Sequence, residues 1–465
     1  MGSFDAIVEA LGRLGYWREP LVPVIGCRRT SSCWGMRNDY WLAGRFEKQV
    51  LGSLLDRCFG ASVDLSDYLV VFHRVPAPLG EYAAEVFAIA LRLGVIEYRA
   101  QGGWFLYPSG AAASLSESMG APVVEVRTRG RLKGKKLRLG SCPDTGCVVI
   151  GAGRWLGAAS IVERLEHGCV VRVRDMAPRG FRLLEPGSVE EAVEANEEIV
   201  GALASEAREF IRRVYARYQA SRGKLYVAFS GGADSAALLE LAREAIGPEN
   251  VVAVYVDTGM EHPETRAYVE KIASITGVDL EIIEPRYDPV ELIAEKGFMT
   301  RDNRWCTKLL KLEPLRDFYQ RKRARLVLDG ARKWESTARA KTPRIGENPL
   351  IPGIVRALPI YHWPRLAVQL FLLERNLPMN QLYNEGLVRI GCMVCPAMHL
   401  YELHISYRLH RDWFHRLAQR VSEARGTPTR STLCYILRGG WRREEEAPGA
   451  RADNKPGLGE GEREH

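Results

Sequence analysis

A short glycine-rich stretch, SGGADS, begins at Ser230 and carries residue types that bind phosphate groups. Ser230 and Ser235 offer hydroxyl donors, while Gly231 and Gly232 let backbone N–H groups converge on an anion. The apolar run KLYVAF precedes the stretch and the helical pattern SAALLELAREAI follows it. A helix N-terminus adds favourable polarity for an anion. The pattern therefore predicts a phosphate-binding turn, in which Asp234 can help to hold Mg²⁺.

The turn is not a GxxxxGK[ST] loop, because no lysine follows the second glycine. A strand–helix turn with capping serines is the structural alternative. Asp257, Thr258 and Gly259 end the next apolar run, at the edge where open α/β sheets bind ligands. Positive charge for a polyphosphate or a sulfonate comes from Lys308, Lys311, Arg332 and Arg339. For each of these four, the alternative is a solvated surface charge.

The cysteines form a second constellation. Cys392 and Cys395 make a CxxC pair, and Cys306 lies in an upstream segment. Two close thiolates with a third from another segment suit an iron–sulfur cluster or a zinc ion. Cys434 and His399 are candidates for the fourth ligand, and a buried apolar thiol is the alternative for Cys434.

A second metal hypothesis concerns the N-terminal half. Cys27, Cys33, Cys142 and Cys147 can form a four-cysteine zinc site, although their spacings are poorer than paired CxxC. Cys58 and Cys169 are interpreted as core residues.

The elements that must position these residues follow from hydrophobic patterning. With 465 residues the chain is too long for one core, so two or three domains are expected. From residue 223 to 441, apolar strands alternate with helices, which predicts an α/β domain with a parallel sheet covered on both faces. A long linker helix is expected over residues 187–222, capped by Ser188 with Glu191.

The rest of the chain is more varied. Residues 1–120 show helical patterns such as YAAEVFAIALRLGVI and are expected to be α-rich. Short β-rich runs over residues 121–186 predict a small β-barrel. The polar tail 442–465 is expected to be disordered.

Four blocks of sequence, in order, resemble the PP-loop ATP-pyrophosphatase superfamily, in the branch of phosphoadenosine-phosphosulfate (PAPS) reductases. They are the SGGADS loop, VYVDTGMEHPET from Val254, RDNRWCTKLLKLEP from Arg301 and GARKWESTAR from Gly330. The resemblance extends over roughly Lys224 to His415. It implies an adenine-nucleotide site in which the loop binds phosphates and the DTG strand contacts the adenosine.

This resemblance assigns the candidate roles. The catalytic candidates are Asp234, Cys306, Lys308 and Arg332. The nucleotide ligands are Ser230, Gly231, Gly232, Asp234, Ser235, Asp257, Thr258, Gly259, Arg332 and Arg339.

Sulfonucleotide reductases of this superfamily can carry a [4Fe–4S] cluster, which implies Cys306, Cys392, Cys395 and Cys434 as ligands here. Cluster-binding reductases usually have two adjacent cysteines, whereas this chain has Cys306 followed by Thr307. Three ligands are therefore visible, and the fourth is open.

A basic run lies before the β-rich segment, with seven basic and no acidic residues from Arg127 to Arg138. Such a run is either a solvated loop or a grip for phosphates. The segment from Gly157 to Pro186 weakly resembles a PUA RNA-binding domain. The formal net charge of +8 is compatible with an anionic partner. Without a signal peptide or an apolar stretch of membrane-spanning length, we expect a cytoplasmic protein with mostly reduced cysteines and no membrane partner.

Three functions compete. The first is an enzyme that uses ATP and Mg²⁺ to adenylate a substrate, such as tRNA, with sulfur delivered from the cluster or from a donor protein. The second is a sulfonucleotide reductase that releases sulfite. The third is a non-catalytic nucleotide- or RNA-binding protein. The full SGGxDS loop resembles superfamily members that cleave ATP, and no reductase-type ECGLH motif occurs. The first function is therefore preferred.

Overall fold

The computed structural model describes residues 17–18, 22–23, 39–77, 80–88, 91–128, 132–180, 187–219, 223–348 and 351–443. The chain divides into two compact units. The first comprises residues 1–257, 261–283 and 315–391, and the second comprises residues 258–260, 284–314 and 392–465. A short pairing of β1 (Trp17–Arg18) with β2 (Val22–Pro23) precedes the larger elements.

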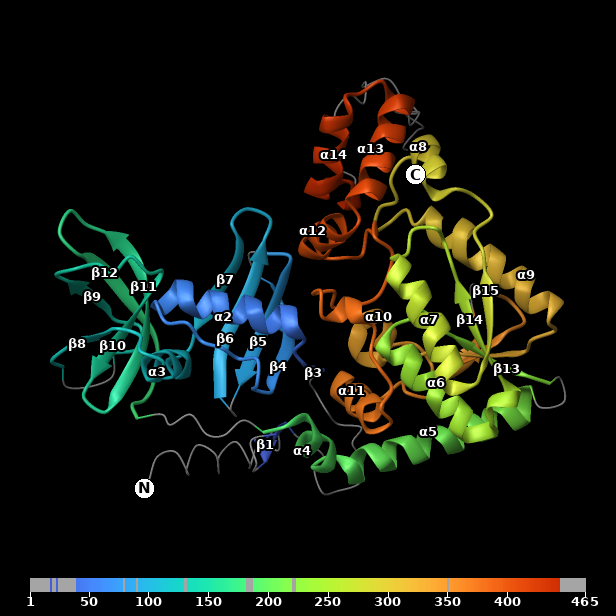
Figure 1. Cartoon of the computed structure of the whole chain (residues 1–465), viewed down its shortest axis with the longest axis horizontal. Coiled ribbons are helices and arrows are strands. Elements are labelled where there is room, and N and C mark those ends of the chain that lie inside the picture. The colour runs from blue at the N-terminus through green and yellow to red at the C-terminus, as the bar shows by residue number, and fades with distance from the viewer. Residues whose placement is uncertain are drawn as a thin grey trace, which may run out of the picture. The chain divides into compact units, whose positions relative to one another are not determined.

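An antiparallel sheet opens the main part of the first unit (Figure 1). Its strands follow in chain order: β3 (Tyr40–Leu42), β4 (Val70–Val75), β5 (Tyr82–Ala88), β6 (Leu91–Arg99) and β7 (Gly103–Pro108). Helices α2 (Arg45–Phe59) and α3 (Gly110–Ser118) accompany it. The expectation of an α-rich region is wrong here, because β5 and β6 occupy the run that reads as helical. Both strands bury residues on successive positions, so cross-strand packing outweighs the helical propensity of alanine and leucine.

A second sheet has the strand order β8-β10-β11-β12-β9. Its strands are β8 (Val123–Glu125), β9 (Lys136–Leu139), β10 (Cys147–Ala152), β11 (Trp155–Arg164) and β12 (Cys169–Pro178). It occupies the region 121–186 where the sequence predicts a small β-barrel, and its strand order leaves β8 and β9 as the two edges of the sheet. One of its faces buries a core that includes Val148, Ile150 and Val171.

A disulfide between Cys58 of α2 and Cys147 of β10 connects the two sheets. This bond corrects two expectations, because Cys58 is more than a core thiol and Cys147 is not available to a zinc ion. Cys27 and Cys33, the other half of that zinc hypothesis, lie outside the described residues.

The linker helix is present but interrupted. Ser188 caps α4 (Val189–Glu194), and Glu191 completes the capping box as expected. A break at Asn196 then starts α5 (Glu197–Tyr218), which packs against α6 (Ala233–Ile246).

The α/β part of the first unit confirms the expected fold class. Its sheet has the order β15-β14-β13-β16-β18-β17, and only β17 runs antiparallel. The strands are β13 (Leu225–Ala228), β14 (Val251–Val256), β15 (Asp279–Ile283), β16 (Leu326–Leu328), β17 (Ile345–Glu347) and β18 (Val355–Ala357). The helical segments between and after them are η3 (Pro248–Asn250), α7 (Pro263–Thr276), α9 (Glu313–Arg321), η5 (Lys333–Glu335), α10 (Thr337–Ala340), α11 (Arg365–Glu374) and η6 (Gln381–Tyr383).

Alternating side chains of β13 face opposite layers. Leu225 and Val227 belong to the core that α5, α6 and α11 share, whereas Tyr226 packs edge-on against Phe318 and Tyr319 of α9. The chain leaves β13 for β14 and β15 on one side, and then crosses to β16 on the other side. The gap between the ends of β13 and β16 is therefore a topological switch point, the usual ligand site of open α/β sheets.

The second unit is mainly helical. It contains α8 (Pro289–Lys296), a π-helical turn (η4, Thr307–Leu312), α12 (Leu400–Leu409), α13 (Arg411–Arg425), α14 (Thr429–Arg438) and η7 (Gly440–Arg443). The expected disorder is wrong for Arg442, which is buried and donates to Met398 O. The rest of the predicted tail, from residue 444, lies outside the described residues. Among the described helices, none is long and apolar enough to cross a membrane.

Candidate nucleotide site

The SGGADS turn links β13 to α6 as the sequence predicts. Gly231 has φ +76°, a left-handed conformation, and a Cβ there would lie 2.6 Å from Thr265 Cγ2. Gly232 caps α6, whose first residue is Ala233. Glycine is therefore required at the point where backbone amides turn toward the end of the strand.

Hydrogen bonds hold this loop from inside. The Ser235 hydroxyl donates to Gly232 O at 2.8 Å and accepts from Ser230 N at 3.3 Å. Asn380 Nδ2 donates to Gly231 O at 3.2 Å. Ser235 is thus engaged in shaping the loop, and its role as a direct phosphate ligand stays a prediction.

Tyr383 is a site residue that sequence reasoning missed. Its hydroxyl accepts from the Ala233 amide at 3.0 Å, at the N-terminus of α6. Burial raises the pKa of Tyr383, so the phenol is neutral near pH 7. No local pattern identifies it, because it follows the loop by 150 residues.

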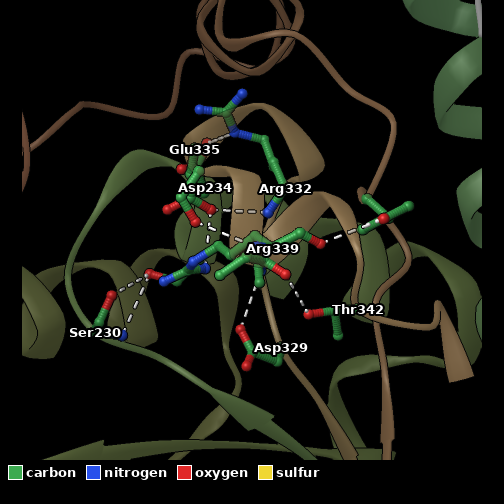
Figure 2. Close-up of polar contacts among 12 residues, drawn as sticks. Ser230, Asp234, Asp329, Arg332, Glu335, Arg339 and Thr342 are labelled. Carbon is green, nitrogen blue, oxygen red and sulfur yellow. Dashed lines mark hydrogen bonds and ion pairs between the residues drawn. The ribbon is translucent and has the colours of Figure 1, made fainter. Parts of the chain in front are cut away.

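Arg332 is the centre of the charged part of the site (Figure 2). It follows β16, so it reaches the loop across the switch point. Its Nε donates to Asp234 Oδ1 at 2.8 Å, and its side chain is 3% exposed. Gly330 permits the approach, because a Cβ there would lie 3.2 Å from the Asp234 backbone. The structure therefore brings two predicted site residues, Asp234 and Arg332, into one ion pair.

The other edge of the Arg332 guanidinium faces Asp39, which sequence reasoning also missed. Nη1 and Nη2 donate to Oδ1 and Oδ2 of Asp39 at 2.8 and 3.3 Å. Nη1 also donates to Trp363 O at 3.2 Å. Burial alone would lower the pKa of Arg332, but Asp234 and Asp39 raise it above its usual range.

Glu335 and Arg339 continue the constellation (Figure 2). Glu335 accepts from Arg332 N at 2.8 Å and from Arg339 Nη1 at 2.9 Å. Burial raises the pKa of Glu335, and Asp234 raises it further. Arg339 is exposed apart from this ion pair with Glu335, and its contact with a nucleotide stays a prediction.

The predicted DTG residues fall in different units. Asp257 belongs to the first unit, where its Oδ2 pairs with Arg266 Nη1 at 3.2 Å. Thr258 and Gly259 belong to the second unit, where Thr258 Oγ1 lies 4.0 Å from Cys392 Sγ.

Three of the four predicted metal ligands lie in one part of the second unit. Burial raises the pKa of Cys306, and Cys395 acts on it in the same direction. Cys392 is on the same segment as Cys395 and lies against Thr258. Cys434 is exposed on α14 and shares no hydrogen bond with another described residue. Cys306, Cys392, Cys395 and Cys434 all belong to the second unit, and their role as metal ligands stays a prediction.

Lys308 and Lys311 lie on the π-helical turn that follows Cys306, and both side chains are exposed. Such turns occur frequently at functional sites. Their contact with a nucleotide stays a prediction.

These observations define the class of protein. A glycine turn between a central parallel strand and a helix, with charged residues from the neighbouring strand at the switch point, is the arrangement of an α/β nucleotide-binding protein. Residues 224–398 match the model of the phosphoadenosine phosphosulfate reductase domain. The chain belongs to this family through that segment.

Relatives were found among archaeal and bacterial proteins. One uncharacterized protein of Methanocaldococcus jannaschii is 37% identical over 266 residues, covering 55% of this chain and 54% of the relative. The chain thus spans about half the length of that relative. A second one from the same organism is 25% identical over 366 residues, covering 76% of this chain and 84% of the relative. The adenosine 5'-phosphosulfate reductase of Streptomyces coelicolor is 31% identical over 164 residues, covering 35% of this chain and 67% of that enzyme.

Among solved structures, the phosphoadenylyl-sulfate reductase of Candida auris in complex with phosphate matches 42% of this chain and 95% of its own, with 23% identity and a TM-score of 0.34.

Proposed function

We propose that this protein binds ATP with Mg²⁺ at the Ser230–Ser235 loop and adenylates an acceptor, releasing pyrophosphate, as the first step of a sulfur transfer. The observation that carries the proposal is that only one oxygen of the Asp234 carboxylate is bound by a described residue. Its Oδ1 pairs with Arg332, while its Oδ2 has no hydrogen bond or ion pair with another described residue.

Counting charges supports a metal-bound ligand. Arg332 contributes one positive charge, and Asp234 with Asp39 contributes two negative charges within hydrogen-bonding distance of it. A phosphate oxygen beside the Asp234 carboxylate would be repelled by it unless a cation lies between them. Carboxylate oxygens are hard ligands that suit Mg²⁺, which binds through one or two carboxylates and the phosphates of the substrate. Asp234 and Glu335 would hold the ion, which neutralises phosphate charge when bound.

In the proposed reaction an acceptor oxygen attacks the α-phosphorus of ATP, and the bond to pyrophosphate breaks. The loop amides after Gly231 bind the leaving phosphates, and Arg339 is placed to stabilise their developing charge. A hydrosulfide sulfur then attacks the activated carbon of the acceptor, where a carbon–sulfur bond forms and the carbon–oxygen bond to AMP breaks. The protein contributes by holding the triphosphate in one orientation, with the α-phosphorus facing the acceptor oxygen.

The test is substrate-dependent release of pyrophosphate. Purified protein receives ATP labelled in the γ-phosphate with Mg²⁺ and bulk tRNA, and the labelled products are separated. We expect pyrophosphate that requires the tRNA fraction. Absence of pyrophosphate with every acceptor fraction, while sulfite appears from a sulfonucleotide and a thiol reductant, would overturn the proposal.

A sulfonucleotide reductase is the second candidate. Its support is the similarity of this chain to the Streptomyces coelicolor enzyme, whose name states adenosine 5'-phosphosulfate reductase. The sulfite assay above separates it from adenylation, because only the reductase releases sulfite and only adenylation releases pyrophosphate.

RNA is the acceptor class that the surface of the first unit favours. On the exposed face of the second sheet, Arg172 of β12 lies directly opposite Lys136 of β9, and Arg138 and Arg174 follow on the same face. Like charges opposite each other destabilise a sheet, so an anionic partner that covers them would offset the cost. Among the described residues, none pairs an acidic side chain with Lys136 or Arg172.

An iron–sulfur cluster is the proposed source or carrier of sulfur. Cys306, Cys392 and Cys395 would hold it, because soft thiolates from two segments suit iron. A sulfur donor protein would supply sulfide in its absence. Iron and acid-labile sulfide analysis after anaerobic purification distinguishes the two: near-stoichiometric iron and sulfide support a resident cluster.

A further inference from the structure

The segment before α2 reaches the nucleotide site from outside the family domain. Asp39 and β3 lie far upstream of residues 224–398, which match the family domain. In the structure, β3 nevertheless packs on α11 of that domain. Leu42 N donates to Gln369 Oε1 at 2.8 Å, and Gln369 Nε2 donates to Leu42 O at 3.1 Å. The segment is therefore held by two hydrogen bonds between the Leu42 backbone and the Gln369 side chain, neither of which involves the site.

Asp39 itself is fixed on two sides. Arg365 N, the first amide of α11, donates to Asp39 Oδ1 at 2.7 Å. The Arg332 fork donates to both carboxylate oxygens. Asp39 is therefore in contact with both a helix N-terminus and a buried guanidinium, two partners that attract a carboxylate.

The consequence for Arg332 is specific. Its Nε edge is taken by Asp234, and its two-nitrogen edge is taken by Asp39. The two-nitrogen edge is the one that clamps phosphate or sulfate in a bidentate manner. With Asp39 in place, that edge does not offer a bidentate clamp to a metal-free anion. Asp234 and Asp39 share the single positive charge of Arg332. The negative charge of Asp234 is therefore only partly neutralised, and Asp234 can still attract a cation.

We propose that Asp39 is a positioning residue that sets ligand specificity: acting through Arg332, it keeps Asp234 available to a nucleotide-bound Mg²⁺ and disfavours metal-free sulfonucleotides. The inference rests on the proposed binding of ATP with Mg²⁺. Asp39 lies outside the family domain, and the nucleotide that it favours is ATP with Mg²⁺.

The test compares two ligands on one variant. Asp39→Asn keeps the shape and an oxygen acceptor for Arg365 N but removes the charge. Binding of ATP and of adenosine 5'-phosphosulfate is measured by calorimetry, each with Mg²⁺ and with EDTA. We expect the gain in ATP affinity on adding Mg²⁺ to fall about tenfold, since one charge at this range is worth about that much. Affinity for the sulfonucleotide in EDTA should hold or increase.

A matched control removes another carboxylate that contacts the same segment. Glu385→Gln breaks an exposed ion pair, 3.1 Å long, with Arg45 at the start of α2, and it does not touch Arg332. This variant should leave both affinities at the wild-type values. Thermal unfolding of both variants is measured in parallel.

The outcomes separate the two claims. If the wild type does not bind ATP with Mg²⁺, both the proposed function and this inference fail. If the wild type binds it and Asp39→Asn leaves the ratio of the two affinities unchanged, the inference alone is overturned. Equal weakening of both ligands with a lower unfolding temperature would also overturn it, since that result indicates a structural role.

Discussion

At the scale of single residues, Gly231 makes the sharpest prediction. Its φ of +76° and the 2.6 Å approach of Thr265 Cγ2 to an added Cβ mean that Gly231→Ala must shift the loop. We expect a loss of about 1–2 kcal/mol in stability from the left-handed backbone. Nucleotide affinity should fall by about tenfold or more, because the amides that face the phosphates move. Calorimetric titration with ATP and Mg²⁺ measures this.

Gly277→Ala is the control for that variant. Gly277 ends α7 with φ +66°, and a Cβ there meets nothing within 4 Å. It should lose similar stability and keep full nucleotide affinity. Equal affinity in the two variants would show that the loop does not bind the nucleotide.

The residue scale also shows what sequence reasoning can reach. The loop was predictable because Ser230 to Ser235 are consecutive and their spacing carries the geometry. Arg332 was predictable from a block of residue types. Asp39 was not, because it meets Arg332 across 293 residues of chain, and a lone aspartate in an unremarkable segment gives no local signal. Tyr383 was missed for the same reason.

At the scale of elements, the exposed face of β9 and β12 predicts nucleic-acid binding. Reversing two opposed charges, Lys136→Glu with Arg172→Glu, should weaken tRNA binding by about tenfold or more and reduce its dependence on salt, because fewer counterions are released. Filter binding at several salt concentrations measures both. Lys271→Glu, an exposed charge reversal on α7, is the control and should retain most of the affinity. Unchanged binding in the double variant would exclude this face.

Elements were predicted unevenly, and the physical reason differs from case to case. The parallel strands were recognisable because a strand buried on both faces is a continuous apolar run, as in Val251–Val256. The hairpin of β5 and β6 was mistaken for a helix because its many alanines and leucines fit a helical period. The choice between helix and strand is decided by pairing with β4 and β7, which the hydrophobic pattern of this run does not reveal. The break at Asn196 was likewise hidden inside an amphipathic pattern.

At the scale of the whole molecule, the disulfide between Cys58 and Cys147 predicts a redox-dependent stability. The bond closes a loop of sequence separation 89 that contains β4 to β7 of the first sheet and β8 and β9 of the second. Chain entropy then assigns it about 4–5 kcal/mol, lost when it is reduced. Urea unfolding with and without dithiothreitol should show the difference, and Cys58→Ser with Cys147→Ser should reproduce it under both conditions.

Cys434→Ser is the matched control, since this exposed thiol on α14 belongs to the second unit and is not disulfide-bonded. Its urea midpoint should follow the wild type in both redox states. Alkylation before and after reduction, read by mass spectrometry, reports the bond directly. Because β3 has its own hydrogen bonds to α11, the nucleotide-induced rise in the urea midpoint should survive reduction. Loss of that rise on reduction would mean that the disulfide, rather than those hydrogen bonds, keeps Asp39 against Arg332.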